Sequence, residues 1–159
     1  MQIQSLTGWQ NHIQAGRKYL NTANKGQSRP TVFNNELIFQ LTALAIEKLI
    51  VGVCQYHRQM PLDHSLSGLV EALAPVCRLD DKLADRIKWI EQIDDMCALT
   101  PVNRNAPSAM EIQGILDVGR QVAGFAEQHV PFLEPECEGC GNPAFRVRGG
   151  LCQAALGHR

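Results

Sequence analysis

Apolar residues recur at every third or fourth position along most of this chain, which is the spacing of one face of an α-helix. Turn-forming residues in 24–30 are expected to end the first such segment. The same spacing predicts further helices over about 31–58, 65–76, 80–99 and 108–130, and no strand-like alternation stands out. The first helix is defined by one apolar face: Leu6, Trp9, Ile13, Gly16, Leu20 and Ala23.

The helix expected over 31–58 is apolar on two sides. A helix that is apolar on most of its surface is buried on most of its surface, so we expect it at the centre of a bundle or in a subunit interface. One stripe comprises Phe33, Leu37, Leu41, Leu44 and Val51, and the other comprises Phe39, Ala43, Ile46, Ile50 and Val53.

Capping residues mark the starts of the later helices. Asp63 or Ser65 suits the N-cap of the helix over 65–76, and Asp80 suits that of the next helix. Ser108 and Glu111 have the spacing of a capping box. These signals predict an all-α, up-and-down bundle of four to five helices over residues 1–131, followed by an irregular tail over 132–159 that contains cysteine, glycine and proline.

Composition narrows the functional classes. The net charge of -1 argues against a bulk electrostatic grip on nucleic acid. The first residues lack the basic and apolar regions of a secretory signal, and polar residues interrupt the apolar run from Leu37 to Val53. We therefore expect a soluble, cytoplasmic protein that has no membrane partner.

Two neighbouring segments resemble the HEPN family (higher eukaryotes and prokaryotes nucleotide-binding domain). They are the apolar helix over 39–49, with its Glu-Lys step, and the Pro-x-x-His-Ser-Leu turn over 61–66. The stretch over 94–107 is similar to the family's segment between its last two long helices. The resemblance covers roughly residues 6–130 and implies a helical bundle that usually forms homodimers. It also implies an RNA-related role, because many members are ribonucleases with an Arg-x4-6-His motif, and many are toxins paired with a nucleotidyltransferase-like antitoxin.

The ribonuclease motif is incomplete in this chain. A metal-free ribonuclease needs a histidine for proton transfer and a cation for the phosphate. Arg104 occupies the expected place, but Ala, Met and Glu follow at 109–111 instead of histidine. Arg58-x5-His64 has the right spacing but crosses a loop, so we interpret it as coincidence. The first hypothesis is therefore a non-catalytic HEPN-like protein. It would dimerise through the helices over 31–58 and 108–130 and bind a nucleotide, RNA or a nucleotidyltransferase-like protein.

Five residues are candidates for ligand or partner binding: Glu47, Lys48, His64, Arg104 and Asn105. Glu47 and Lys48 are charged residues in an apolar helix and are costly to bury unpaired, so they form either a structural pair or part of a groove or dimer interface. His64 either helps to form the turn or belongs to the same site. Arg104 is either a solvated loop residue or a contact for a phosphate or a partner.

Two alternatives involve other residues. In one, the protein is a metal-independent ribonuclease in which Arg104 meets a histidine that is distant in sequence, His64 or His129. In the other, the tail is a zinc-dependent interaction module, because Cys137-x2-Cys140 has the form of a zinc knuckle. Its remaining ligands would be Cys152 and His158. A tail of free thiols is the plainer interpretation, so neither a metal nor a cofactor is predicted.

Overall fold

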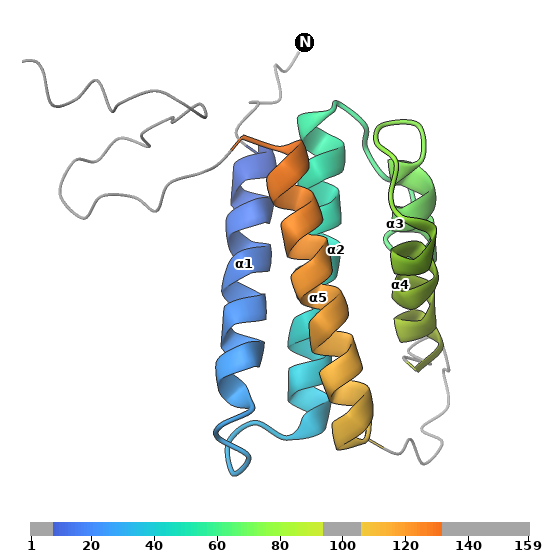
Figure 1. Cartoon of the computed structure of the whole chain (residues 1–159). Helices are drawn as coiled ribbons and strands as arrows, with labels where there is room; N and C mark the ends of the chain where they lie inside the picture. Colours follow the sequence, from blue (N-terminus) through green and yellow to red (C-terminus); the bar gives the residue numbers. More distant parts are fainter. Residues whose placement is uncertain (1–7, 94–105, 132–159) are drawn as a thin grey trace, which may run out of the picture.

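The computed structural model describes residues 8–93 and 106–131. Within these ranges the chain forms five helices and no strand, which confirms an all-α fold and a helical bundle (Figure 1). The proposed tail over 132–159 lies outside the described residues. The helices are α1 (Gly8–Gly26), α2 (Asn35–Tyr56), α3 (Leu66–Leu73), α4 (Asp81–Ile93) and α5 (Ala109–His129).

The body of the bundle consists of α1, α2 and α5, which lie side by side (Figure 1). The Asn35 side-chain amide at the start of α2 donates to the carbonyl of Pro107, just before α5, over 2.8 Å. These two helices therefore begin at the same end of the bundle and run in the same direction. The glycines Gly8 and Gly16 of α1 lie against Gln55 and Leu49 of α2, so α1 runs in the opposite direction.

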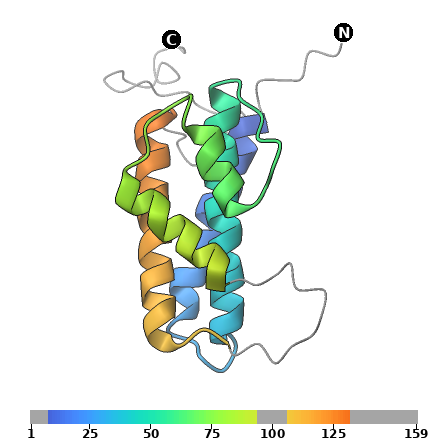
Figure 2. The same ribbon diagram turned by 90° about the vertical axis from the view of Figure 1, so that its right-hand side faces the viewer.

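The parallel arrangement of α2 and α5 departs from a simple up-and-down bundle, in which neighbouring helices alternate in direction. With 22 residues, α2 is about 33 Å long. The 8 residues of α3 span only about 12 Å and the 13 residues of α4 about 20 Å. The return path between α2 and α5 is therefore divided between two short helices, and Figure 2 shows α4 lying obliquely across the long ones.

The capping residues expected from the sequence are confirmed. The Ser65 hydroxyl accepts a hydrogen bond from the Gly68 N–H at the start of α3. The Asp80 carboxylate accepts from the N–H groups of residues 82 and 83 at the start of α4. Ser108 and Glu111 bond each other's backbone N–H groups, which is a capping box. Each helix start after α2 is thus determined locally.

The end of α1 differs from the expectation, because the helix continues to Gly26 instead of stopping near Asn24. The Asn24 amide donates to the Leu20 carbonyl one turn back, and its side-chain oxygen accepts from Arg120 of α5. A tertiary contact thus keeps a residue that favours turns inside the helix.

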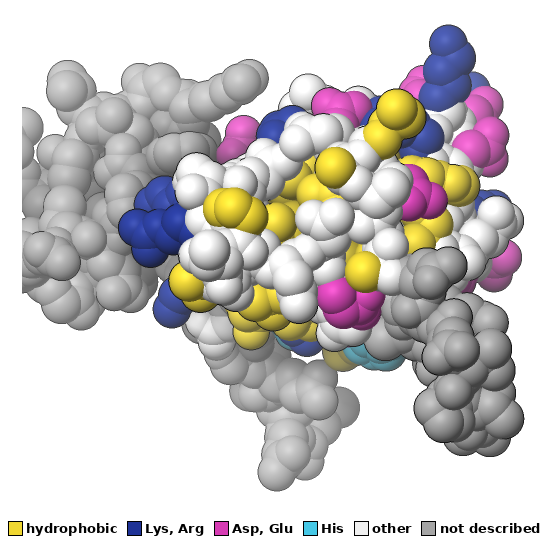
Figure 3. Space-filling view, turned by 90° about the horizontal axis from the view of Figure 1, so that it is seen from below, with side chains coloured by type: hydrophobic (Ala, Val, Ile, Leu, Met, Phe, Trp, Pro, Cys, Tyr) yellow, Lys and Arg dark blue, Asp and Glu magenta, His cyan; other side chains and the backbone are white. Residues whose placement is uncertain are grey.

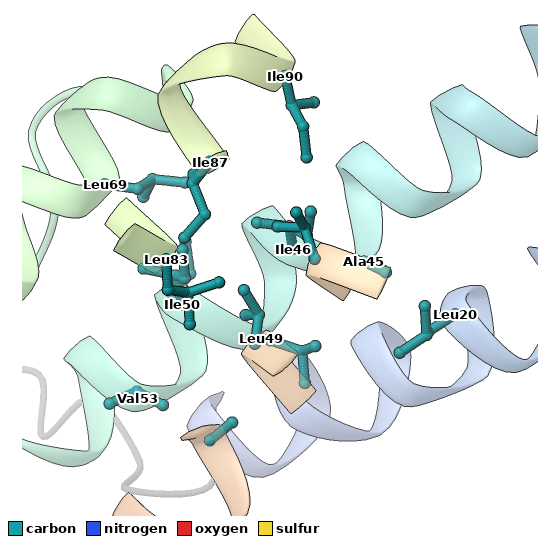
Figure 4. Close-up of a cluster of buried hydrophobic side chains, with 14 of the residues drawn as sticks. Leu20, Ala45, Ile46, Leu49, Ile50, Val53, Leu69, Leu83, Ile87 and Ile90 are labelled. Atoms are coloured by element: carbon teal, nitrogen blue, oxygen red, sulfur yellow. The ribbon is translucent and has the colours of Figure 1, made fainter. Parts of the chain in front are cut away.

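The core surrounds α2. Figure 4 shows Ile46 and Ile50 of α2 on the side that faces Leu83 and Ile87 of α4. The opposite side of α2 faces α1 and α5, and there Leu49 touches the position where Gly16 would carry a Cβ atom, 2.7 Å away. Glycine at that position lets the two helices approach closely.

By length and composition, α2 is the one helix of the described residues that meets the criterion for a membrane span, with a mean hydropathy of 1.9 over its most apolar window. This differs from the expectation drawn from its interrupting polar residues. In the bundle, 61% of that window is buried, and the core helix of a soluble protein passes the same test.

A candidate binding groove on the open face of α2

A groove of about 650 Å³ lies between α2, the α2–α3 connection and α4. We call it the α2 groove. Leucines form its apolar surface and carboxylates form most of its polar surface. Its described lining residues are Leu37, Gln40, Leu41, Ala43, Leu44, Glu47, Asp63, His64, Ser65, Leu66 and Glu91.

The apolar wall is part of a stripe that the sequence pattern predicted to be buried. Leu37 is 40% exposed, and both Leu41 and Leu44 are only partly covered. Together with Glu47 they follow a spacing of three or four residues, so they line one face of α2 over about 15 Å of its length. In the neighbouring stripe, Ile46 and Ile50 are fully buried. The groove therefore exists because α3 and α4 cover one apolar stripe of α2 and leave the other open.

The polar end of the groove unites the two segments that carry the family resemblance. His64 Nδ1 donates to Glu47 Oε1 over 3.2 Å when its proton is on that nitrogen. Lys48 Nζ lies 3.6 Å from the same oxygen. Glu47 and Lys48 are both partly exposed. Of the two, Glu47 bonds His64 of the turn and also lines the groove. Glu47 thus has a structural partner, and its role in binding a ligand or a partner stays a prediction.

The loop between α2 and α3 is shaped by local interactions that present His64. Arg58 follows the C-cap residue of α2 with a φ of 61°, a left-handed conformation that turns the chain away from the helix axis. Asp63 then accepts hydrogen bonds from the N–H and the hydroxyl of Ser65. These bonds favour the ionised carboxylate and lower the pKa of Asp63 below its usual value. The turn thus holds the Asp63 carboxylate against Ser65, the residue that caps α3.

The far wall of the groove is held by α4. Glu91 accepts hydrogen bonds from both the N–H (3.1 Å) and the hydroxyl of Ser67, so it ties α4 to the first turn of α3. Three carboxylates, those of Glu47, Asp63 and Glu91, therefore gather around residues 63–67. Among the described lining residues there is no lysine or arginine, and His64 is the one basic side chain.

A further titratable neighbour, His12 of α1, was missed by the sequence reasoning. Burial is the main cause that lowers its pKa below 6.5, and the positive charge of Lys48 acts in the same direction. Glu47 acts in the opposite direction. Its position just before the buried Ile13 was the available signal, but nothing in the sequence shows which residues of α2 it faces. The described residues include no group of three side chains able to hold a metal ion.

The structure thus brings together three of the five candidate residues, Glu47, Lys48 and His64. Arg104 and Asn105 lie outside the described residues, and so do the tail residues of the zinc hypothesis. His129 sits in the last turn of α5, where its ring stacks on Phe125 and Nδ1 donates to the carbonyl of that residue over 2.8 Å. The buried Cys54 has a thiol pKa raised to about 11 by desolvation, which keeps it protonated and unreactive.

Exposed apolar side chains also occur at the end of the bundle where α2 and α5 begin. Val32 is 67% exposed and Met110 is 85% exposed. Viewed onto this end, hydrophobic side chains are interspersed with polar and charged ones (Figure 3). This surface thus mixes apolar with polar side chains, whereas leucines line one wall of the α2 groove.

Comparison with known proteins gives no match for this chain among family models, curated proteins or solved structures.

Proposed function

We propose that this protein is a non-catalytic, HEPN-like binding module that takes a protein partner in the α2 groove. The observation that carries the proposal is the meeting of Glu47 and His64. They come from the two segments that carry the resemblance, and together they form one end of a groove with partly exposed leucines. The two segments that resemble the family thus contact each other in the structure.

The charge of the groove favours a protein over a nucleotide or RNA. Phosphate groups are usually held by lysine, arginine or helix N-termini, whereas three carboxylates repel them. No lysine or arginine is present among the described lining residues to offset that repulsion. Exposed leucines in a concave setting are typical of a surface that another protein covers. A nucleotidyltransferase-like protein is the specific partner that the resemblance suggests, and Arg104 and Asn105 are candidates for further contacts with it.

A homodimer, which the resemblance also suggests, would compete with the partner for the same surface. The open stripe of α2 is the apolar surface that a second copy would cover, while α5 already packs against α2 within the chain. The proposal therefore places any self-association on the groove side of α2.

Co-expression with the products of neighbouring genes tests the proposal. We expect a stable complex in size-exclusion chromatography that is lost when Leu37 is replaced by glutamate, because the charge would lie in the apolar wall. Leu37→Glu should leave the protein folded, since Leu37 is 40% exposed and lies in the first turn of α2, where a carboxylate interacts favourably with the helix dipole. Met110→Glu introduces the same change at an exposed site outside the groove and should leave the complex intact.

Titration with ATP and with a single-stranded RNA completes the test. The proposal expects no saturable binding of either to the isolated chain. Tight binding of either one that Leu37→Glu abolishes would contradict it.

A metal-independent ribonuclease is the second candidate, and the grouping of His12, Lys48 and His64 around Glu47 favours it. Two histidines and a lysine supply the proton acceptor, the proton donor and the cation that RNA cleavage requires. Cleavage measured with EDTA present should then fall at least about 100-fold in His12→Ala and in His64→Ala. Equal activity in both variants and the wild type, or no activity at all, would end this candidate; Arg104→Ala tests the motif arginine in parallel.

A further inference from the structure

We propose that the occupant of the α2 groove is an amphipathic helix with apolar anchors and a lysine or arginine beyond them at one end. This inference rests on the proposed function and adds the chemistry of the partner. It is carried by two features of the groove, its linear apolar wall and its one-sided charge.

The apolar wall has the shape of a helix-binding surface. Leu37, Leu41 and Leu44 succeed one another along α2, and the stripe from Leu37 to Glu47 is about 15 Å long. A partner helix lying along it would use about ten residues, or three turns, with apolar side chains at positions i, i+3 or i+4, and i+7. Leu66 at the start of α3 borders the same groove from the other side.

The charge of the groove is concentrated at one end. Asp63 bonds Ser65, Glu91 bonds Ser67, and Glu47 bonds His64, so the three carboxylates surround the start of α3. Serine hydroxyl and backbone N–H groups bond Asp63 and Glu91 without neutralising their charge. Among the carboxylates, Glu47 also has the ammonium group of Lys48 within 3.6 Å. A cationic side chain that follows the apolar anchors of the partner would meet this acidic end.

A volume of about 650 Å³ would also suit a small molecule. The favoured occupant is nevertheless a helix, because the leucines are spread along α2 instead of converging on one point. A small cationic amphiphile, a second copy of the chain and a segment of this chain outside the described residues are the competing occupants, and each is an outcome of the experiment below.

Selection from a random 16-residue peptide library displayed on phage tests the inference with the full-length protein as bait. Counter-selection on Leu37→Glu removes peptides that bind elsewhere. We expect enriched sequences with apolar residues spaced by three or four and at least one lysine or arginine beyond the last of them. Enriched sequences that are acidic, or that lack helical spacing, would overturn the inference.

The best enriched peptide is then titrated by fluorescence anisotropy against two double variants. Glu47→Gln with Glu91→Gln keeps the hydrogen-bond acceptors and removes two charges, and we expect it to weaken binding about tenfold. Glu71→Gln with Asp85→Asn makes the same change in charge at exposed positions of α3 and α4 outside the groove. This control should stay within about twofold of the wild type. Equal affinities for both double variants would overturn the role of the carboxylates.

The competing occupants give different results. Decylamine that binds in a Leu37-dependent way, with no helical peptide enriched, would assign the groove to a small amphiphile. A concentration-dependent dimer that Leu37→Glu dissociates, with no peptide bound, would assign it to a second copy. Peptides that bind only after deletion of residues 132–159 would assign it to the chain's own C-terminal segment. Each of these results contradicts the inference.

The failure of the inference differs from the failure of the proposed function. If the neighbour complex depends on Leu37 while no basic amphipathic peptide is enriched, the partner binds in the groove by other chemistry. If neither the complex nor any peptide depends on Leu37, the groove is not the binding site and both proposals fall. Leu41→Gln provides a second groove variant should Leu37→Glu unfold, which circular dichroism reports.

Discussion

Two faces of α2 are apolar but differ in cover: the face toward α1 and α5 is closed, and the face that carries Leu37, Leu41 and Leu44 is open. On the closed side, glycines of α2 and of its neighbours let the helices pack closely: a Cβ atom on Gly52 of α2 would lie 2.7 Å from Ile13, and one on Gly119 of α5 would lie 2.9 Å from Thr42. On the open side, short helices held apart by a polar turn leave Leu37, Leu41 and Leu44 partly exposed. The closed side accounts for the fold and the open side is available for binding.

This difference shows that apolar residues along one face of a helix do not by themselves reveal whether that face is buried within the monomer. Burial of a leucine stabilises the monomer only where another element is long enough and close enough to cover it. The 22 residues of α2 make it longer than α3, with 8 residues, and longer than α4, with 13 residues, so neither short helix alone can cover its whole length. Substitutions on the two sides should therefore separate stability from binding.

The largest effect is expected from Leu49→Ala on the closed side. Leu49 is 1% exposed and packs over Gly16, so its truncation should cost about 2–5 kcal/mol of unfolding free energy. Leu37→Ala on the open side should cost less than about 1 kcal/mol, while weakening the partner complex. Urea denaturation followed by circular dichroism measures both, and similar losses from the two variants would remove the distinction between the sides.

A smaller effect is expected from a methyl group added to the closed side. In Gly16→Ala the new Cβ would lie 2.7 Å from Leu49 Cγ and 3.0 Å from the Ala45 carbonyl oxygen, so α1 must shift, at a cost of about 1–3 kcal/mol. Gly124→Ala is the matched control on α5. Nothing lies within 4 Å of its Cβ position, so alanine should stabilise the helix by about 0.5–1 kcal/mol. Thermal denaturation should show a lower melting temperature for Gly16→Ala and a higher one for Gly124→Ala. A shift in the same direction for both variants would contradict the close approach of α1 to α2.

The stability of the closed side should also depend on the residues that cap its helices. Ser108→Ala removes the side chain that accepts the Glu111 N–H at the start of α5, and we expect a loss of about 1 kcal/mol. Because α5 does not border the groove, the affinity for the selected peptide should stay unchanged. Chemical denaturation and peptide titration of the same sample check the two halves of this prediction.

The smallest effect concerns His12 at the margin between the two sides. Burial and Lys48 lower its folded-state pKa below 6.5, so between that lowered pKa and 6.5 the folded protein holds fewer protons than the unfolded chain. Stability contributed by His12 is therefore complete above pH 6.5 and is lost as the pH falls below it. His12→Gln removes this dependence. Because His12 is only partly buried, the melting temperature of the wild type should fall by only about 1 °C more than that of His12→Gln between pH 7.5 and 5.5. A larger fall in the variant would reverse the sign and contradict the pKa shift.

Local signals in the sequence predicted the helices well. Ser65, Asp80 and Ser108 were identified as caps because capping depends on residues within one turn, and all three cap as expected. The predicted end of α1 was wrong because Asn24 is held in the helix by a hydrogen bond from Arg120, which is 96 residues away in the sequence. Of the predicted up-and-down bundle, the helical bundle is confirmed. The sequence pattern did not show that α2 and α5 run in the same direction, because this follows from tertiary contacts such as that of Asn35 with Pro107.

The candidate site was predictable only in part. Glu47, Lys48 and His64 could be selected because charge within an apolar helix and a histidine in a capped turn are both unusual in a sequence. Their contact, the groove beside them and the participation of His12 and Glu91 depend on how α1, α2 and α4 cross. Arg104 and Asn105 lie outside the described residues, so their role stays a prediction.

Methyl NMR of the full chain, labelled with carbon-13 at its leucines, tests the central claim most directly. Upon addition of the partner, or of the selected peptide, the methyl signals of Leu37, Leu41, Leu44 and Leu66 should shift. Those of Leu20, Leu49 and Leu116, which are buried and lie outside the groove, should stay in place. Shifts confined to these buried leucines, or saturated binding with unmoved groove signals, would contradict the assignment of the open face of α2 as the binding site.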